Sequence, residues 1–540
     1  MFPATPQFEA ALKILRVLHS AGYEAYLAGG CVRDLLLGRE PKDYDVATAA
    51  TPDVVLRLFP RTFAVGAHFG VVLVATCGTC GAAESHEVVT EVATFRSDGA
   101  YSDGRHPDAV RYTASAEEDV RRRDFTINGL LLDPIGQDLC SSRSQNGDLR
   151  HPAEDRIALK GHGFSRAAEQ QSEGAALSAE GMQIAEDPFP QGLKLGSLGP
   201  QPAARLNPCP FRTSDVHEAP EGYNLRLAVI DHVGGLADLD AGIFRAIGRP
   251  ELRFEEDHLR MLRGVRFAAR FGFELEPQTA AAMRRLAPRT AAVSRERVRD
   301  ELTKMLTEGH ARRAFELLDE TGLLAEVLPE VARMKGVAQP PQFHPEGDVW
   351  THTLLLLEQL EPGCPLTLAW GALLHDVGKP PTFRLAERIR FDGHVEVGVA
   401  MGAEICRRFR FSNGETRQTL ALIENHMRFM DAQRMKASTL KRFFRLESFN
   451  QHLALHRMDC LAASGNLENW EFVRERYLAM PEEAVRPRPL LTGRDLIAAG
   501  YAPGASFKQM LHAVEDAQLE GTIATPDEAL KLVRERFPTM

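Results

Sequence analysis

The sequence predicts an α+β protein in which a mixed sheet with helices is followed by an all-helical remainder. Short apolar runs with strand-like alternation occur in the first 135 residues and again from Ala228. From residue 248 onward, apolar residues instead recur at helical spacing. The stretch between the two sheet-forming parts has neither period. These observations divide the chain into a sheet-containing part, an interruption and a long helical part.

The length and composition indicate several globular domains. The chain has 540 residues, of which 44% are hydrophobic and 26% charged, and a chain of this length does not fold around a single core. No apolar run reaches membrane-spanning length, the N-terminus lacks the pattern of a signal peptide, and eight cysteines are scattered without a framework. We therefore expect a cytoplasmic protein with no membrane partner and no obligate protein partner.

The charge is unevenly distributed. The net charge is −10, which argues against a general polyanion-binding surface. Residues 245–313, however, hold 15 Arg and 1 Lys against 10 Asp and Glu. This local excess is a candidate nucleic-acid footprint. The alternative is that these arginines form salt bridges on helix surfaces.

Residues 27–48 (LAGGCVRDLLLGREPKDYDVAT) combine two features of a phosphate and metal site. Gly29 and Gly30 predict a turn without side chains, followed by a helix that points backbone N–H groups at an anion. Asp43 and Asp45 are two residues apart, so on a strand both carboxylates face the same side. Each feature alone is common in turns and solvated loops. Together they predict a nucleotidyl-transfer site, because Mg²⁺ binds one or two carboxylates together with substrate phosphates.

The following segments add a candidate third carboxylate. Alternation puts Glu91 and Ala93 on the same face of a predicted strand, so Glu91 can lie beside the two aspartates; the alternative is a solvent-facing glutamate. Residues 96–107 (RSDGAYSDGRHP) have no apolar period and predict a mobile loop. The strands predicted in this part of the chain are Ala25–Ala28, Val71–Thr76 and Val88–Phe95.

Residues 121–128 (RRRDFTIN) lie between a predicted helix start at Ala116–Val120 and a predicted buried strand at Leu130–Asp133. Three arginines before an aspartate can be ordinary surface charge. Their position beside a buried strand instead favours contacts to a triphosphate and a ribose. We therefore interpret this motif as part of a nucleotide site.

Residues 136–227 change in character. They are rich in Ser, Gln, Gly, Pro and Ala and show no periodicity. A structureless loop of this length is uncommon inside a compact domain. The strand pattern resumes at Ala228 (AVIDHVGG), as if continuous with Leu130–Asp133. We interpret the segment as an inserted, largely disordered excursion.

Residues 253–267 (RFEEDHLRMLRGVRF) predict a helix whose core stripe includes Leu259 and Leu262. Asp257 and Arg260 are three residues apart on a polar flank and can act side by side. One interpretation is a surface ion pair. The other is base recognition, because an acceptor beside a donor matches the exocyclic amino group and unprotonated ring nitrogen that cytosine and adenine share. Guanine and uracil present the reverse pattern, so this pair is a candidate selector of CTP and ATP.

A different chemistry begins after residue 344. His375 and Asp376 follow an apolar helix in ALLHDVGKP, with His352 upstream and Asp459 downstream, and this oxygen–nitrogen set suits a divalent metal. His394 and His426 would allow a second metal, as in two-metal hydrolysis. We interpret the other histidines of this region as ordinary core or surface residues, namely His344, His452 and His456.

These motifs together resemble the class II tRNA nucleotidyltransferase and bacterial poly(A) polymerase family, in the bacterial form that carries an HD-type phosphohydrolase domain. The resemblance rests on GGCVRD with DYD, EVATFRSD with DGRHP, RRRDFTIN, EEDHLRMLRGVRFAARFGF and HDVGKP. It implies a polymerase-beta-like head and helical parts that hold the tRNA acceptor arm. The implied division is a head at 1–135 and 228–247 around the insertion at 136–227, a neck and body at 248–335, an HD-type domain at 336–480 and a helical tail at 481–540.

The resemblance also implies roles for individual residues. Asp43 and Asp45 would hold Mg²⁺, with Glu91 as a third catalytic carboxylate. The implied ligands of an HD-site metal such as Ni²⁺, Mn²⁺ or Co²⁺ are His352, His375, Asp376 and Asp459, with His394 and His426 for a second ion. The implied nucleotide-binding set is Gly29, Gly30, Arg33, Arg122, Arg123, Asp124, Asn128, Asp257, Arg260, Arg263 and Arg266.

The function that these patterns predict is addition of CMP and AMP from CTP and ATP to the 3′ end of tRNA. Within the same chemistry, the alternatives are a poly(A) polymerase or an enzyme that adds only CC or only A. From a different class, the chain could be a metal phosphohydrolase whose degenerate nucleotidyltransferase half binds RNA; the intact carboxylate pair and the RRRDFTIN motif speak against this. The residues do not determine the number of nucleotides added, the oligomeric state or the HD-type substrate.

Overall fold

The computed structural model describes residues 2–3, 5–63, 70–80, 84–99, 109–135 and 225–538. Within these ranges the predicted α+β class is confirmed, because strands of one mixed sheet precede a long run of helices. The predicted insertion lies outside the described residues up to residue 224. No described helix is long and apolar enough to cross a membrane.

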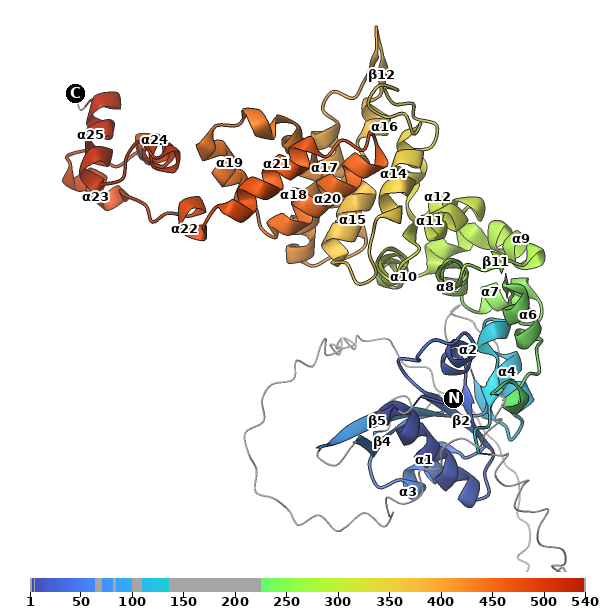
Figure 1. Ribbon diagram of the computed structural model, residues 1–540. Helices are drawn as coiled ribbons and strands as arrows, with labels where there is room; N and C mark the ends of the chain where they lie inside the picture. Colours follow the sequence, from blue (N-terminus) through green and yellow to red (C-terminus); the bar gives the residue numbers. More distant parts are fainter. Residues whose placement is uncertain are drawn as a thin grey trace, which may run out of the picture. The chain divides into compact units, whose positions relative to one another are not determined.

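A seven-stranded mixed sheet forms the N-terminal part (Figure 1), in the order β3-β4-β5-β2-β1-β8-β9. Strand β2 runs parallel to β5, whereas β1 is antiparallel to both β2 and β8. The strand predicted to resume at Ala228 is β9, the antiparallel neighbour of β8. The strands are β1 (Ala25–Ala28), β2 (Asp45–Thr48), β3 (Thr62–Phe63), β4 (Val71–Cys80), β5 (Glu84–Thr94), β8 (Leu131–Leu132) and β9 (Val229–Ile230).

The prediction of a mobile loop at residues 96–107 is wrong at its start. Arg96–Asp98 forms strand β6, which pairs with β7 (Val110–Tyr112) in a separate two-stranded sheet. Strand pairing forms backbone hydrogen bonds and does not require an apolar stripe, so the apolar pattern did not indicate this strand. Residues 100–108 lie outside the described ranges.

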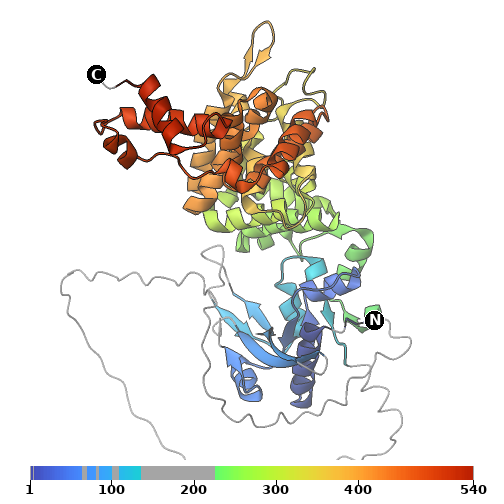
Figure 2. The ribbon, with the colours of Figure 1, turned by 60° about the vertical axis from the view of Figure 1, so that its left-hand side comes forward.

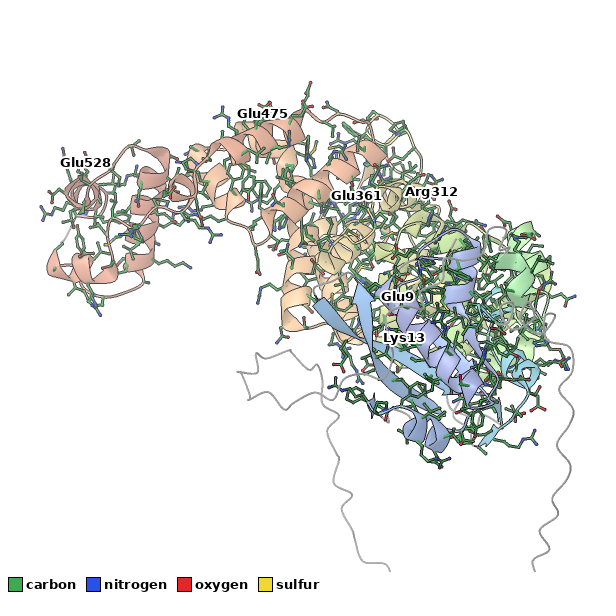
Figure 3. The ribbon with its side chains drawn as sticks, turned by 60° about the horizontal axis from the view of Figure 1, so that its bottom comes forward. Glu9, Lys13, Arg312, Glu361, Glu475 and Glu528 are labelled. Atoms are coloured by element: carbon green, nitrogen blue, oxygen red, sulfur yellow. The ribbon has the colours of Figure 1, made fainter. Side chains whose placement is uncertain are left out.

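The head helices are α1 (Pro6–Ser20), α2 (Gly30–Leu36), α3 (Pro52–Leu58) and α4 (Ala116–Arg121). Helix α1 begins where the Thr5 hydroxyl accepts the N–H of Phe8, and its buried stripe packs against β4 and β5. Glu9 and Lys13, labelled in Figure 3, lie one turn apart on α1 between the buried positions.

A hydrophobic core continues from the 121–128 motif into the helical part. Phe125 is fully buried, and its ring lies 4.3 Å from that of Phe244. The same core includes residues of the following helices up to Ala462. The first helices of this core are α6 (Gly235–Ala241), α7 (Pro250–Glu256), α8 (Leu259–Phe271), α9 (Pro277–Leu286), α10 (Arg295–Thr307), α11 (Ala311–Glu320), α12 (Leu323–Val327) and α13 (Pro329–Ala332), with the short strands β10 (Ile243–Phe244) and β11 (Glu274–Leu275) between them.

The helical part continues as a helical bundle (Figure 2), which contains the predicted metal residues. Arg312 of α11, labelled in Figure 3, joins the bundle to the preceding helices through an ion pair of 2.7 Å with Glu358. Its elements are α14 (Val349–Glu358), α15 (Leu366–Leu374), α16 (Lys379–Thr382), β12 (Arg384–Leu385), β13 (Ile389–Arg390), α17 (His394–Arg408), α18 (Asn413–Asn425), the 3₁₀ helix η5 (His426–Arg434), α19 (Ala437–Phe444), α20 (Phe449–Ala462) and α21 (Glu468–Ala479).

The C-terminal helices have a small core of their own, which includes Leu496, Val514 and Val533. Its contacts to α19 are polar, because Arg442 and Arg445 both bond the carboxylate of Glu515. The helices of this core are α23 (Gly493–Ala498), α24 (Ser506–Glu520) and α25 (Pro526–Arg536), whereas Val485 of the preceding α22 (Glu482–Val485) belongs to the core that includes Phe429 and Phe443.

Candidate functional site

The sheet places two of the three predicted carboxylates side by side, and the third lies two residues before the first of them. Asp45 begins β2, and the parallel register that pairs Val46 with Val92 places Asp45 beside Glu91 on the same face. Asp43 lies just before the strand, and the intervening Tyr44 is buried. Desolvation and the nearby Glu91 carboxylate raise the pKa of Asp45 to about 6. This mutual repulsion makes the edge a site where a cation would be stabilised.

The glycine turn lies against an arginine of the 121–128 motif. Gly29 has φ 74° and ψ −126° and immediately precedes α2, a backbone conformation that other residues rarely adopt. A Cβ at Gly29 would lie 3.1 Å from Nη1 of Arg123. The absence of a side chain therefore lets a guanidinium approach the backbone beside the carboxylates. Gly30 is the first residue of α2.

Arg122 and Arg123 are both held by Asp119, a residue outside the predicted site. The Asp119 carboxylate accepts from Nη2 of Arg122 at 2.6 Å and from Nη2 of Arg123 at 3.0 Å. Burial of Asp119 would raise its pKa, but the two guanidiniums lower it. Asp119 lies in α4, three residues before Arg122 and four before Arg123. This helical spacing is the feature of the sequence that could have indicated the contact.

Asp124 and Asn128 are buried and bonded to each other. The Asp124 carboxylate accepts from Nδ2 of Asn128 at 3.2 Å and pairs with Arg263 of α8 at 2.8 Å. The Asn128 side-chain oxygen accepts from Nη1 of Arg33 at 2.5 Å. Arg33 is itself only 4% exposed and donates to the Asp34 carboxylate. Desolvation by burial lowers the pKa of its guanidinium. The head motif is therefore linked to the helix α8 through charged side chains.

The prediction that Asp257 and Arg260 share one helix flank is wrong. Helix α7 ends at Glu256 and α8 begins at Leu259, so Asp257 lies in the bend between them. Its carboxylate accepts the N–H of Leu259 at 3.0 Å, which caps α8. An acidic side chain is favourable at a helix N-terminus and here stabilises the start of α8 after the bend. The apolar stripe alone did not indicate this bend.

The two side chains of this candidate base-selecting pair have different partners. Asp257 pairs with Arg297 of α10 at 2.8 Å, while Arg260 pairs with Glu256 and donates to the carbonyl of Arg253 at 3.1 Å. The side chains of Asp257 and Arg260 are 13% and 12% exposed. They are therefore not an exposed surface ion pair, and their role in base recognition stays a prediction.

Most arginines of the basic segment at 245–313 are neutralised. Arg266 is buried and pairs with Glu301 at 2.7 Å, and Arg270 reaches Glu308. The structure thus uses Arg266 inside the helical core rather than on a surface. Eleven of the fifteen arginines in this segment pair with a carboxylate, namely Arg245, Arg253, Arg260, Arg263, Arg266, Arg270, Arg285, Arg297, Arg299, Arg312 and Arg313.

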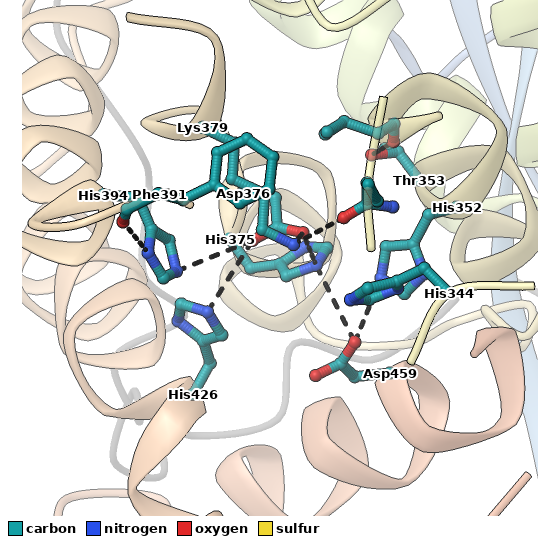
Figure 4. A network of polar contacts seen from close by, with 12 residues as sticks. His344, His352, Thr353, His375, Asp376, Lys379, Phe391, His394, His426 and Asp459 are labelled. Atoms are coloured by element: carbon teal, nitrogen blue, oxygen red, sulfur yellow. Dashed lines mark hydrogen bonds and ion pairs between the residues drawn. The ribbon is translucent and has the colours of Figure 1, made fainter. Parts of the chain in front are cut away.

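The second site collects all six predicted metal residues in the bundle (Figure 4). Nε2 of His352 lies 3.0 Å from an oxygen of Asp459, and Nε2 of His375 lies 4.0 Å from the same oxygen. The described residues His352, His375 and Asp459 form one set whose ligand atoms all lie within 4.8 Å of one another. Helices α14 and α20 and the end of α15 position them.

A second set lies next to the first. One oxygen of Asp376 is 3.9 Å from Nε2 of His394 and 3.8 Å from Nε2 of His426, and these three residues also meet the 4.8 Å limit. The other Asp376 oxygen is 3.2 Å from Nε2 of His375, which belongs to the first set. Asp376 therefore presents one oxygen to each set.

The ring orientations fit metal binding. Nδ1 of His375, His394 and His426 donates to a backbone carbonyl at 2.7–2.9 Å, and Nδ1 of His352 donates to Glu346 at 2.7 Å. The four Nε2 atoms are buried and face the carboxylates of Asp376 and Asp459. Each ring is held through Nδ1 so that Nε2 faces the centre, which is the orientation that metal-ligating histidines show.

Three residues of this centre were missed or assigned otherwise. Glu346 accepts from both His352 and His344, so His344 adjoins the site instead of being an unrelated histidine. Lys379 is buried and lies 2.6 Å from Asp376. The available signals were HPEG before α14 and the Lys three residues after Asp376. By contrast, His452 and His456 are buried core residues, as predicted.

Comparison with known families matches three parts of the chain in order. Residues 25–149 match a family model for the poly(A) polymerase head domain, 272–335 one for the probable RNA and SrmB-binding site of polymerase A, and 348–463 one for the HD domain. The chain belongs to the family of CCA-adding enzymes and poly(A) polymerases. The head match extends to residue 149 and so includes the first part of the predicted insertion.

Characterised family members resemble this chain over different lengths. The CCA-adding enzyme of Geobacillus thermodenitrificans (strain NG80-2) is 33% identical over 327 residues, which cover 61% of this chain and 56% of the relative. The matched region thus spans just over half of that relative. The CCA-adding enzyme of Lactobacillus helveticus (strain DPC 4571) is 26% identical over 530 residues, 97% of this chain and 96% of the relative.

Solved structures of CCA-adding enzymes share the fold. The Bacillus stearothermophilus enzyme, solved in complex with CTP, aligns with a TM-score of 0.61 at 24% identity and covers 99% of this chain and 98% of its own. The Thermotoga maritima enzyme, solved with a tRNA, aligns with a TM-score of 0.52 at 15% identity and covers 98% and 96%. Family membership and fold do not test single residues, so the roles predicted for the site residues stay predictions.

Proposed function

We propose that this protein is a CCA-adding enzyme, which transfers CMP and AMP from CTP and ATP to the 3′ end of tRNA. The observation that carries the proposal is the position of Asp45 among the charges of Glu91, Arg123 and Asp43, with Arg123 against the Gly29 turn. A carboxylate cluster next to a guanidinium and a glycine turn can hold the triphosphate end of a nucleotide.

In this reaction the 3′ hydroxyl oxygen of tRNA bonds to the α-phosphorus, the bond to the bridging oxygen breaks, and pyrophosphate leaves. Asp43 and Asp45 would hold Mg²⁺, with Glu91 as a third carboxylate, since an all-oxygen donor set suits this ion. Bound Mg²⁺ supplies charge stabilisation on the attacking and leaving oxygens. Arg122 and Arg123, fixed by Asp119, would position the phosphates.

Base selection would occur at the bend between α7 and α8. The Asp257 carboxylate can accept from the exocyclic amino group of cytosine or adenine, and Arg260 can donate to the ring nitrogen. Arg297 holds the Asp257 carboxylate and Glu256 holds Arg260, so both groups are positioned before a base arrives. A preorganised pair rejects a base with the reverse pattern, because buried polar groups would be left unpaired.

The test is incorporation of labelled CTP and ATP onto tRNA that lacks CCA. We expect products that are three nucleotides longer and end in CCA. A long tail of A would indicate the poly(A) polymerase alternative, and products that end after CC, or that form only from tRNA ending in CC, would indicate a partial enzyme. No incorporation would leave the phosphohydrolase alternative.

We further propose that the HD-type centre hydrolyses phosphate esters. The observation that favours this second activity is the set of four inward-pointing Nε2 atoms around the Asp376 and Asp459 carboxylates. His352, His375, Asp376 and Asp459 would hold a divalent ion such as Ni²⁺, Mn²⁺ or Co²⁺, with His394 and His426 contributing to a second. Such ions activate water and neutralise phosphate charge.

The residues around this centre set its geometry. Glu346 holds the His352 ring so that Nε2 faces inward, and Lys379 holds Asp376. The test is hydrolysis of a phosphomonoester and of a 2′,3′-cyclic phosphate with each metal added in turn. No hydrolysis with any of these ions would assign the centre a structural role.

A further inference from the structure

A short hairpin projects from the bundle between α16 and α17, immediately before His394 (Figures 1 and 2). Its strands, β12 and β13, are antiparallel and two residues long. The hairpin is exposed along most of its length, and Leu385 at its outer end is 76% exposed. A two-stranded ribbon of this size buries too little surface to be stable by itself. Packing of the outer residues therefore does not explain why the chain forms this hairpin.

The hairpin carries like charges at positions where they repel each other. Arg384 and Arg390 are direct cross-strand partners, and like charges in this position destabilise a hairpin. Arg388 adds a third positive charge in the turn, next to Glu387. Among the described residues, none of these three arginines has an ion-pair partner. A polyanion bound to these arginines would offset their mutual repulsion, because each guanidinium would then lie near a negative charge.

The base of the hairpin is part of the HD-type centre (Figure 4). The Phe391 carbonyl accepts from Nδ1 of His394 at 2.9 Å, and the Phe391 ring lies 5.4 Å from Nζ of Lys379. Lys379 in turn pairs with Asp376. Arg390 precedes Phe391, and the four Cα–Cα steps from Arg390 to His394 span at most about 14 Å.

We propose that residues 383–391 form a docking arm for the phosphodiester backbone of single-stranded RNA whose terminal phosphate lies at the HD-type centre. The proposal rests on the phosphohydrolase activity proposed for that centre and names its substrate class. A mononucleotide carries one phosphate group, which the centre itself would bind. The arm arginines need further phosphates nearby, and a strand supplies them at regular spacing. Guanidinium groups also stack on unpaired bases, which favours a single strand over a duplex.

Two substrates with the same reactive group separate the arm from the centre. One is a short oligoribonucleotide that ends in a 2′,3′-cyclic phosphate, and the other is the corresponding mononucleoside 2′,3′-cyclic phosphate. In both, water oxygen bonds to phosphorus, one ester bond opens, and the released ribose oxygen takes a proton. The full chain is assayed with the metal that gives the highest rate on the mononucleotide.

The variant is Arg384→Ser combined with Arg390→Ser, which removes a repulsive pair and should not unfold the exposed hairpin. We expect kcat/KM for the oligonucleotide to fall about 10-fold or more, and kcat/KM for the mononucleotide to stay within about twofold. The salt dependence of the oligonucleotide KM should become less steep by about 1.4 in log–log slope, since each lost phosphate contact on a single strand contributes about 0.7. The control, Arg16→Ser combined with Arg434→Ser, removes the same charge at exposed positions outside the hairpin.

Unchanged oligonucleotide hydrolysis, or equal losses on both substrates, would overturn the docking arm while the proposed hydrolase stands. An equal loss in the control variant would also overturn it, because net charge and not the hairpin would then be responsible. Wild-type protein that hydrolyses neither substrate with any metal would overturn the proposed hydrolase and the arm together.

Discussion

The guanidinium of Arg33 in the head lies 4.4 Å from the ring centroid of Phe271 in helix α8. The same side chain donates to Asn128 in the RRRDFTIN motif. Arg33 is therefore a buried cation between the glycine turn, the candidate ribose-binding motif and the helix that begins beside Asp257. The contact links the candidate phosphate and base sites through one side chain.

Replacing Arg33 by Lys tests this link. The charge remains, but a lysine cannot stack on the ring and bond Asn128 and Asp34 together. We expect a loss of about 1–3 kcal/mol in stability, from unpaired buried groups, and a higher KM for CTP and ATP together. Thermal unfolding and single-nucleotide incorporation measure the two effects. Arg39→Lys is the matched control, because Arg39 lies 5.2 Å from the same ring but is exposed; equal effects in both variants would contradict the link.

Asp43→Ala and Asp45→Ala test the carboxylate cluster. Each variant should lose more than about 10³-fold in nucleotide incorporation, since metal-based charge stabilisation contributes several kcal/mol. Binding of tRNA should remain close to wild type, because the lost group holds a metal and not RNA. Asp53→Ala, at an exposed position of α3 in the same domain, should leave both unchanged. Substantial incorporation by either cluster variant would remove these residues from the catalytic role.

Asp257→Ala tests base selection. Loss of the acceptor should relax discrimination against UTP and GTP more than it slows incorporation of CTP, because a wrong base then leaves fewer buried groups unpaired, at about 1–3 kcal/mol each. Arg260→Ala should raise the KM for CTP and ATP together, since both bases would use the same donor. The assay is incorporation of all four nucleotides onto tRNA ending in CC and onto tRNA lacking CCA. Unchanged selectivity in both variants would place base recognition elsewhere.

Metal binding at the HD-type centre can be measured without an activity assay. Dialysis against Mn²⁺ or Co²⁺ followed by elemental analysis should find bound metal in the wild type, and His375→Ala should bind less. His426→Ala should lose metal from the set around Asp376 and His394 while leaving incorporation of CTP intact, because the carboxylate cluster lies in the head. Equal metal content in His375→Ala and the wild type would contradict the predicted ligands.

Buried His452 should make the free energy of unfolding depend on pH. Both ring nitrogens lack a hydrogen-bond partner among the described residues, and burial followed by the nearby Arg428 lowers the pKa of His452 to about 4. The ordinary pKa of histidine is about 6.5, so between these two values the unfolded chain binds a proton that the folded chain does not. Stability should therefore fall as the pH falls from about 6.5 to about 4, by up to roughly 3 kcal/mol from this group.

His452→Leu should reduce this acid sensitivity, because it fills the same buried space without a titratable group. The measurement is the midpoint of thermal unfolding between pH 4 and pH 7. His232→Asn, which replaces an exposed histidine, should keep the slope of the wild type. Parallel curves for His452→Leu and the wild type would show that this histidine does not contribute.

The sequence by itself determined the residue types and order of both sites. Alternation and the two-residue spacing of Asp43 and Asp45 predicted the sheet edge, because side-chain direction in a strand follows from chain position alone. The spacing of His375, Asp376 and the flanking histidines predicted a metal centre, because few other uses bring these groups together at the end of an apolar helix.

The tertiary structure determined which side chains orient the predicted site residues. Asp119, Glu346 and Lys379 orient the predicted residues from positions that carry no motif of their own, because a hydrogen-bond partner is set by packing in space. The bend at Asp257 separated a pair that helical periodicity had placed on one flank, since a cap interaction competes with helix continuation within a few residues. The proximity of Asp45 and Glu91, 46 residues apart, likewise depends on the register of β2 and β5, which the sequence pattern of either strand alone does not specify.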